Sequence, residues 1–213
     1  ALEREVKGAK VNAGGNGMIA DNVMKAVSDH ANLVRQACES GADAVVMGAG
    51  LPVDLPDITA NYPGTALIPI LSEARGVGVI LKKWMKKGRL PDAIVIEHPK
   101  YAAGHLGSPK IEEIADPKYD FSSVLPKIWD LFKELGLKEK EIPIIVAGGI
   151  TSHEHVKTAL NDLGASAVQL GTAFAVTQEG DAHPNFKDVL LKANPKEDLA
   201  TFISTSGFPA RGV

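Results

Sequence analysis

Two glycine turns in this 213-residue sequence carry residues suited to binding a ligand. They lie in VAGGI (146–150) and QLGTAF (169–174), about one strand and one helix apart. Each turn ends an apolar run, where small residues let backbone N–H groups approach a phosphate closely. The residues that would form this predicted phosphate site are Gly148, Gly149, Gln169, Gly171 and Thr172. The alternative is two tight turns that need glycine only for their conformation.

A histidine in KYAAGHLG (100–107) is the candidate catalytic residue. It follows the apolar run DAIVIEH (92–98), and its small neighbours, including Ala103 and Gly104, leave room for a planar ligand. Imidazole titrates near neutral pH, so His105 is suited to abstract a proton or donate a hydrogen bond. The alternative is an exposed histidine in a loop.

Four polar residues occur within or at the ends of apolar runs. Asn22 interrupts one run and Ser72 ends another, and buried polar groups need partners. Each therefore bonds a ligand or ties neighbouring strands together. Glu97 and His98 end the run before His105. We expect these two at a solvated strand end, although they could also face the site.

The elements that must position these residues alternate between strands and helices. We expect strands at 17–24, 42–50, 66–72, 92–98, 142–150 and 165–174. We expect helices at 28–41, 76–88, 121–136, 152–164 and 186–193. This order predicts one α/β domain over 1–213 with a parallel sheet, either a barrel or a doubly wound sheet. Both architectures place their chemistry at the carboxyl ends of strands. The long connection 99–120 is a candidate lid or binding loop.

Composition excludes several classes of function. The net charge is −3, which argues against a nucleic-acid or anionic-membrane partner. Apolar runs reach about seven residues, whereas a membrane-spanning helix needs about 20. The single cysteine, Cys38, rules out an internal disulfide and fits a reducing, cytoplasmic location. His153 and His155 would point to different sides of a helix, so we expect no metal site there.

Six segments occur in the order found in one known family. They are GADAVVMGAGLPVDLP, LIPILSEARGVGVILKKW, PDAIVIEHPKYAAGHLG, IPIIVAGGI, ASAVQLGTAF and SGFPARGV. With these segments the chain resembles the nitronate monooxygenases, formerly called 2-nitropropane dioxygenases. That family is similar to the flavin-type enoyl-acyl carrier protein reductases. The resemblance covers nearly all of the chain.

The resemblance implies a (β/α)8 TIM barrel that holds non-covalent FMN at the strand ends. The FMN phosphate would lie on the two glycine turns, and Asn22 would contact the flavin ring together with Ala103 and Gly104. His105 matches the family's catalytic histidine. The implied reaction oxidises small alkyl nitronates or nitroalkanes with dioxygen to a carbonyl compound and nitrite. A homo-oligomer is compatible with this assignment.

The chain is shorter than such a barrel. Six expected strands and 213 residues compare with eight strands and about 250 residues. We therefore expect a partial barrel that lacks the first two strands and the C-terminal segment, with weak or absent FMN binding. An NAD(P)H-dependent flavin enoyl reductase is one alternative. A non-catalytic flavin- or phosphate-binding remnant is another, favoured by Ala103 where the family has glycine. A flavin-free barrel acting on a sugar phosphate is a third.

Overall fold

A computed structural model describes residues 1–138 and 141–213 of the chain. Its α-helices are α1 (Leu2–Ala13), α2 (His30–Glu39), α3 (Leu55–Ile58), α4 (Ala74–Met85), α5 (Phe121–Glu134), α6 (His153–Lys157), α7 (Thr172–Ala175) and α8 (Pro184–Lys192). Its strands are β1 (Ala20–Met24), β2 (Ala44–Gly48), β3 (Ala66–Leu71), β4 (Ile94–Glu97), β5 (Gly104–His105), β6 (Ile144–Ala147), β7 (Ala167–Gln169), β8 (Ala200–Ile203) and β9 (Pro209–Gly212).

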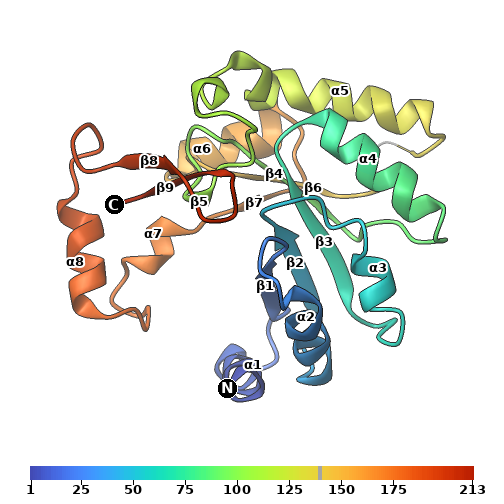
Figure 1. Ribbon diagram of the computed structural model, residues 1–213, viewed down its shortest axis with the longest axis horizontal. Coiled ribbons are helices and arrows are strands. Elements are labelled where there is room, and N and C mark those ends of the chain that lie inside the picture. Colours follow the sequence, from blue (N-terminus) through green and yellow to red (C-terminus); the bar gives the residue numbers. More distant parts are fainter. Residues whose placement is uncertain (139–140) are drawn as a thin grey trace.

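The main sheet holds the six strands that the sequence predicts. All its pairs are parallel, in the order β1-β2-β3-β4-β6-β7, and the sheet curls as an incomplete barrel (Figure 1). Helices cover its convex side. The expectation of a partial (β/α)8 barrel is thus confirmed, with β1 and β7 at the two edges of the described sheet. A smaller antiparallel sheet, β5-β9-β8, lies beside it.

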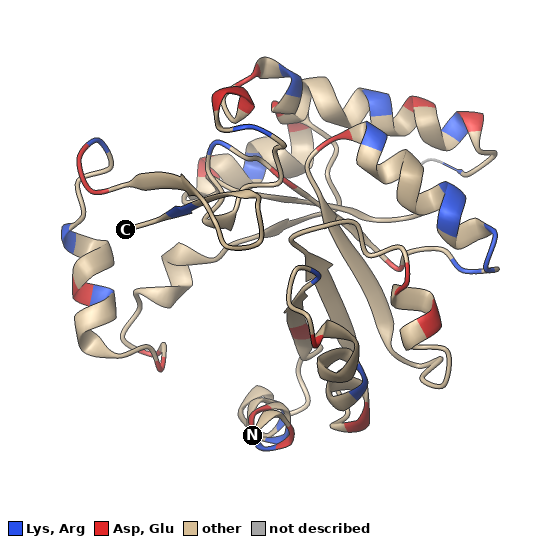
Figure 2. Ribbon diagram, viewed as in Figure 1, with Lys and Arg blue, Asp and Glu red and all other residues tan. Residues whose placement is uncertain are grey.

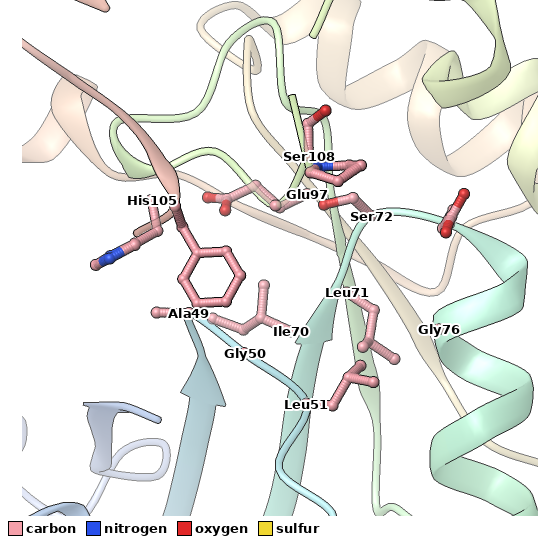
Figure 3. A pocket seen from close by; sticks show the side chains of 14 residues that line it. Ala49, Gly50, Leu51, Ile70, Leu71, Ser72, Gly76, Glu97, His105 and Ser108 are labelled. Atoms are coloured by element: carbon pink, nitrogen blue, oxygen red, sulfur yellow. The ribbon is translucent and has the colours of Figure 1, made fainter. Parts of the chain in front are cut away.

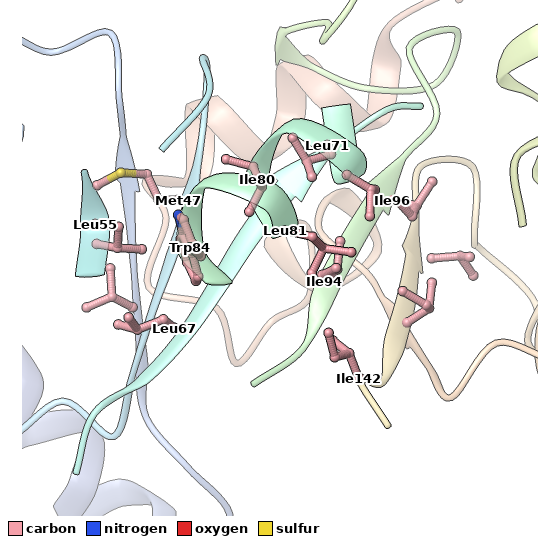
Figure 4. Close-up of a cluster of buried hydrophobic side chains, with 14 of the residues drawn as sticks. Met47, Leu55, Leu67, Leu71, Ile80, Leu81, Trp84, Ile94, Ile96 and Ile142 are labelled. Atoms are coloured by element: carbon pink, nitrogen blue, oxygen red, sulfur yellow. The ribbon is translucent and has the colours of Figure 1, made fainter. Parts of the chain in front are cut away.

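The outer face of the sheet forms the core against the helices. In β3, Leu67, Pro69 and Leu71 are buried, whereas the alternating residues are only partly covered. Helix α4 contributes Trp84, whose indole N–H donates to the carbonyl oxygen of Pro52 at 3.1 Å (Figure 4). Alternation with period two in a strand and with period 3.6 in a helix explains why these elements pack through one face each. Cys38 is buried in this core, as its helical position suggests.

Several elements differ from the expected ones. The run 165–174 is not one strand, because β7 ends at Gln169 and α7 begins at Thr172. The helix expected over 152–164 is α6 followed by the π-helical turn η3 (Thr158–Asp162). The pairing of β5 with β9 joins residues about 100 positions apart, and two-residue strands have no detectable sequence period. These short elements are therefore set by tertiary contacts.

The long connection 99–120 is a folded segment. Besides β5 it contains two 3₁₀ turns, η1 (Ile111–Glu113) and η2 (Pro117–Tyr119). Leu106 and Tyr119 are buried, and the Tyr119 hydroxyl donates to Ser108 Oγ at 3.3 Å. Because its own side chains pack inward, this connection can hold His105 in a fixed position.

Charged residues lie mainly on the outer helices and loops, where positive and negative side chains alternate (Figure 2). The net charge is −3. Of the helices that the structure describes, none is both long and apolar enough to cross a membrane.

Candidate active site

Three polar side chains face the concave side of the sheet. Pairing places Asn22 opposite Val46 in β2, and it places Glu97 opposite Ala147 in β6 and Ala147 opposite Gln169 in β7. Residues directly opposite one another in a sheet share a face, as do residues two apart in one strand. Following the register from β1 to β7 puts Asn22, Glu97 and Gln169 on the same face. The carboxyl ends of these strands carry most of the predicted site.

His105 lies on β5, where its pairing with Ala210 of β9 holds the backbone. Its Nε2 atom is 2.6 Å from Ser206 Oγ, which is 2.6 Å from Ser204 Oγ. Ser204 Oγ donates in turn to the carbonyl oxygen of Phe208 at 3.0 Å. His105 is therefore a partly buried, hydrogen-bonded residue and not an exposed loop histidine.

The hydrogen bond from Ser204 to Phe208 favours one histidine tautomer, in which each hydroxyl donates away from the imidazole ring. A carbonyl oxygen only accepts, so the Ser204 proton points to Phe208 and Ser204 accepts from Ser206. In that arrangement Ser206 accepts from His105, and the ring proton is assigned to Nε2. The Nδ1 atom is left with a lone pair, and no described residue donates to it. This arrangement suits a histidine that takes a proton at Nδ1.

A cavity of about 480 Å³ opens beside His105 (Figure 3). Its wall comes from the carboxyl ends of β2, β3 and β4 and from the segments next to β5 and β9. The residues that line it include Ala49, Gly50, Leu51, Ile70, Leu71, Ser72, Glu97, His105, Gly107, Ser108 and Phe208. Of the residues predicted for the catalytic and FMN sites, only His105 lines this cavity. Ser72 and Glu97, for which contact with a ligand was left open, line it too. The segment after β2 therefore forms part of the cavity wall.

Glu97 and His98 do not form a solvated strand end, so that expectation is wrong. Glu97 is partly buried and lines the cavity, and burial raises the pKa of its carboxyl group from 4.5 to about 7. His98 is 4% exposed; its Nδ1 accepts from the Lys100 backbone N–H, and its Nε2 lies 3.1 Å from the Asp120 carboxylate. The carboxyl end of β4 is covered by protein and not by solvent, because the 99–120 connection folds back over it.

The glycines after β6 have a packing role of their own. Gly148 and Gly149 have φ values of +93° and +77°. A Cβ at Gly148 would lie 3.1 Å from the carbonyl oxygen of His98, and one at Gly149 would lie 3.0 Å from the ring of Tyr101. The conformational alternative therefore accounts for these two glycines without a ligand.

The turn after β7 differs. Gly171 has no positive φ, and a Cβ built on it meets no atom within 4 Å. The side chains of Gln169 and Thr172 make no hydrogen bond to any described residue, and neither does Asn22 at the other edge. Packing thus does not require glycine at 171, and the polar groups around it are available to a ligand.

Ala103 and Gly104 precede His105. Gly104 has a φ of +64°, whereas Ala103 is not among the residues with positive φ. The alanine therefore needs no left-handed backbone, and it carries no sign of strain.

Sequence reasoning left several cavity residues unassigned. Glu97 was marked only by an acidic residue at the end of an apolar run, and Ser72 by a hydroxyl in the same position on β3. Ser204 and Phe208 reach the site through the pairing of β9 with β5, which no local pattern indicates. Ser206 stands in the SGFPARG segment of the resemblance, without a pattern that assigns it to His105.

Comparison with known proteins agrees with the resemblance. The model of the family described as "Nitronate monooxygenase" matches residues 5–213. A probable nitronate monooxygenase of Bacillus subtilis (strain 168) is 33% identical over 120 residues, which cover 56% of this chain and 31% of that protein. The chain thus spans about a third of that relative's length.

Two solved structures share the fold. FabK from Thermotoga maritima superposes with a TM-score of 0.71 at 24% identity, over 99% of this chain and 59% of FabK. Nitroalkane oxidase from Streptomyces ansochromogenes gives a TM-score of 0.61 at 20% identity, over 99% of this chain and 55% of that one. With the family match over almost its whole length, the chain belongs to the nitronate monooxygenase family.

Proposed function

We propose that this chain supplies the flavin-binding and catalytic face of an oxidoreductase. The reaction oxidises an alkyl nitronate or nitroalkane with dioxygen to a carbonyl compound and nitrite. The observation that carries the proposal is the His105–Ser206–Ser204 chain at the cavity wall, which leaves one imidazole nitrogen available. Family membership supports this class of reaction.

The cofactor we propose is FMN, and the concave face fits it in its polar groups. Asn22, Ala103 and Gly104 would contact the flavin ring. Gln169, Gly171 and Thr172 would hold the phosphate, with Gly148 and Gly149 in the neighbouring turn. The open space at Gly171 supports this placement, because a Cβ there would enter it. When bound, FMN supplies the transfer of electrons from substrate to dioxygen.

The protein residues position the substrate and manage one proton. His105 Nδ1 accepts the proton from the carbon next to the nitro group, or the protonated ring donates a hydrogen bond to a nitronate already formed. The Nε2–H group keeps its bond to Ser206 and so stabilises the imidazolium. The apolar cavity wall excludes water from the alkyl group of the substrate.

The test measures cofactor binding and turnover on the same protein. FMN added in large excess, because the partial barrel is expected to bind it weakly, should give the shifted absorbance of bound flavin. Butyl nitronate should then give oxygen uptake and nitrite without nicotinamide. With neutral nitrobutane as substrate, from which a proton must be removed, His105→Asn should lower kcat about 100-fold or more, because a positioned base contributes about 10²–10⁴ in rate. Flavin content should not change, since His105 acts on substrate.

Ser206→Ala is the matched control, because it keeps the imidazole and removes only its hydrogen-bond partner. We expect it to cost about tenfold in kcat, in line with the loss of one positioning bond. Activity seen only with NAD(P)H and an enoyl thioester would contradict the proposed reaction. Absence of any flavin spectrum would support the non-catalytic remnant. Loss of flavin from His105→Asn would contradict the role given to His105.

A further inference from the structure

The cavity beside His105 has an apolar wall with a polar end. Leu51, Ile70, Leu71 and Phe208 supply hydrocarbon surface. Its volume of about 480 Å³ lies within the range of about 300–1,000 Å³ found for small-molecule sites. Glu97 reaches this wall from β4 and Ser72 from β3, and Figure 3 shows the Glu97 carboxyl group extending between Ser72 and His105.

Glu97 has no partner among the residues that the structure describes. No hydrogen bond or ion pair reaches its carboxyl group there, and burial holds part of the group in the neutral form near pH 7. The other titratable groups of the cavity wall are His105, whose Nε2 is bonded to Ser206, and Glu73 before α4. His98, the next residue in the chain, is bonded to Asp120 instead.

Ser72 is a second unpartnered polar group at the same end. It is 7% exposed, and its hydroxyl makes no hydrogen bond to any described residue. The 105–109 segment approaches it so closely that a Cβ on Gly107 would lie 2.1 Å from Ser72 Oγ. Buried hydroxyl and carboxyl groups are nearly always hydrogen-bonded in folded proteins. A carboxyl and a hydroxyl without partners on the wall of one cavity therefore indicate a ligand with polar groups that bond them.

We propose that Glu97 and Ser72 select substrates whose alkyl chain ends in an uncharged polar group, and that they reject substrates with an anionic end. An amide or hydroxyl can donate to Glu97 and accept from Ser72. A carboxylate would meet the ionised Glu97 in a wall of low polarity, where like charges are poorly screened. This inference rests on the proposed function for the identity of the reacting group, but not for the selection itself.

Binding of two unreactive probes tests the selection without any catalytic step. Hexanamide and hexanoate have the same chain length and differ in the charge of the end group. At pH 8.5 we expect the full chain to bind hexanamide at least tenfold more tightly than hexanoate, with both affinities measured by NMR titration. At pH 6 the ratio should fall severalfold, because Glu97 is then largely protonated while hexanoate remains ionised.

Glu97→Gln keeps the shape of the side chain and removes its charge. We expect it to reduce the pH 8.5 ratio to threefold or less and to remove its pH dependence. Glu73→Gln is the matched control, since it removes the other carboxyl group of the lining; we expect it to change the ratio less than twofold. The pH comparison uses the wild-type chain alone. It therefore still tests the proposal if Glu97→Gln does not fold.

Several results would overturn the proposal. These are equal affinity for the two probes at pH 8.5, failure of both to bind at millimolar concentration, or an equal effect of the two glutamate variants. The same ratio should appear in kcat/KM for the nitronate of 3-nitropropanamide against propionate 3-nitronate, which differ only in the charge of the end group. No turnover of either nitronate, with the binding preference intact, would refute the proposed function and leave this selection standing.

Discussion

The Glu97 carboxyl group couples the stability of the fold to pH. Its pKa is raised from 4.5 to about 7 by burial alone. The folded state therefore binds a proton more tightly than the unfolded state, and stability falls as pH rises from about 4.5 to about 7. At about 1.4 kcal/mol per pKa unit, the shift amounts to about 3 kcal/mol of lost stability above neutral pH.

Glu97→Gln should remove this loss. We expect the variant to exceed the wild type by about 2–3 kcal/mol in free energy of unfolding at pH 8.5, and by little near pH 4.5. Urea denaturation at the two pH values measures the difference. Glu134→Gln on the exposed side of α5 serves as the control. A gain for Glu97→Gln that is the same at both pH values would show that ionisation is not its cause.

Single residues also show where sequence reasoning works. His105 was found because its small neighbours and its place after an apolar run are local features. Glu97 and Ser72 were harder to assign, since their burial depends on the 99–120 connection folding over the strand ends. The turn predicted at the glycines after β6 is present. The contact between the ring of Tyr101 and Gly149 could not be predicted from residue spacing.

At the scale of elements, the stability of the segment that follows β5 depends on one close approach, between Gly107 and Ser72. Gly107 has a φ of +67°, and a Cβ there would lie 2.1 Å from Ser72 Oγ. Gly107→Ala should therefore lower the free energy of unfolding by about 2–4 kcal/mol, from backbone strain and overpacking together. Chemical denaturation measures this loss.

Gly104→Ala is the matched control for the contact. Gly104 has nearly the same φ, +64°, but a Cβ there meets no atom within 4 Å. We expect it to cost about 1–2 kcal/mol from strain alone. Adding Ser72→Ala to Gly107→Ala removes the colliding oxygen and should recover the excess. Equal losses for the two glycine variants would contradict the collision.

At the scale of elements, long apolar or amphipathic segments were predictable and short ones were not. The six strands of the main sheet and helices such as α4 and α5 lie where their periodicity indicates. The strands β8 and β9 were missed because Ala200–Ile203 and Pro209–Gly212 lack the continuous apolar run that precedes each turn of the main sheet. Arg211 on β9 donates to the carbonyl oxygens of Lys100 and Ala102, contacts that only the folded chain brings together.

In the whole molecule, buried residues are unevenly distributed along the chain. The core extends from α1 to Ala165, and no residue between 166 and 208 is buried. Large apolar side chains in this later part are exposed, among them Phe174 at 64% and Ile203 at 57%. Local opening costs least where few apolar contacts are lost. The segment from α7 to β8 should therefore open without unfolding the rest.

Hydrogen exchange followed by mass spectrometry tests this division. We expect the slowest exchange in β2, β3 and β4, whose amides open only with the core, and much faster exchange in α7, α8 and β8. Leu81→Ala leaves a cavity beneath α4 and should destabilise the core by about 2–5 kcal/mol. Exchange in β2–β4 should then accelerate while that in α8 stays the same, because α8 already exchanges through local opening. Equal acceleration in both regions would instead show that the chain unfolds as one cooperative unit.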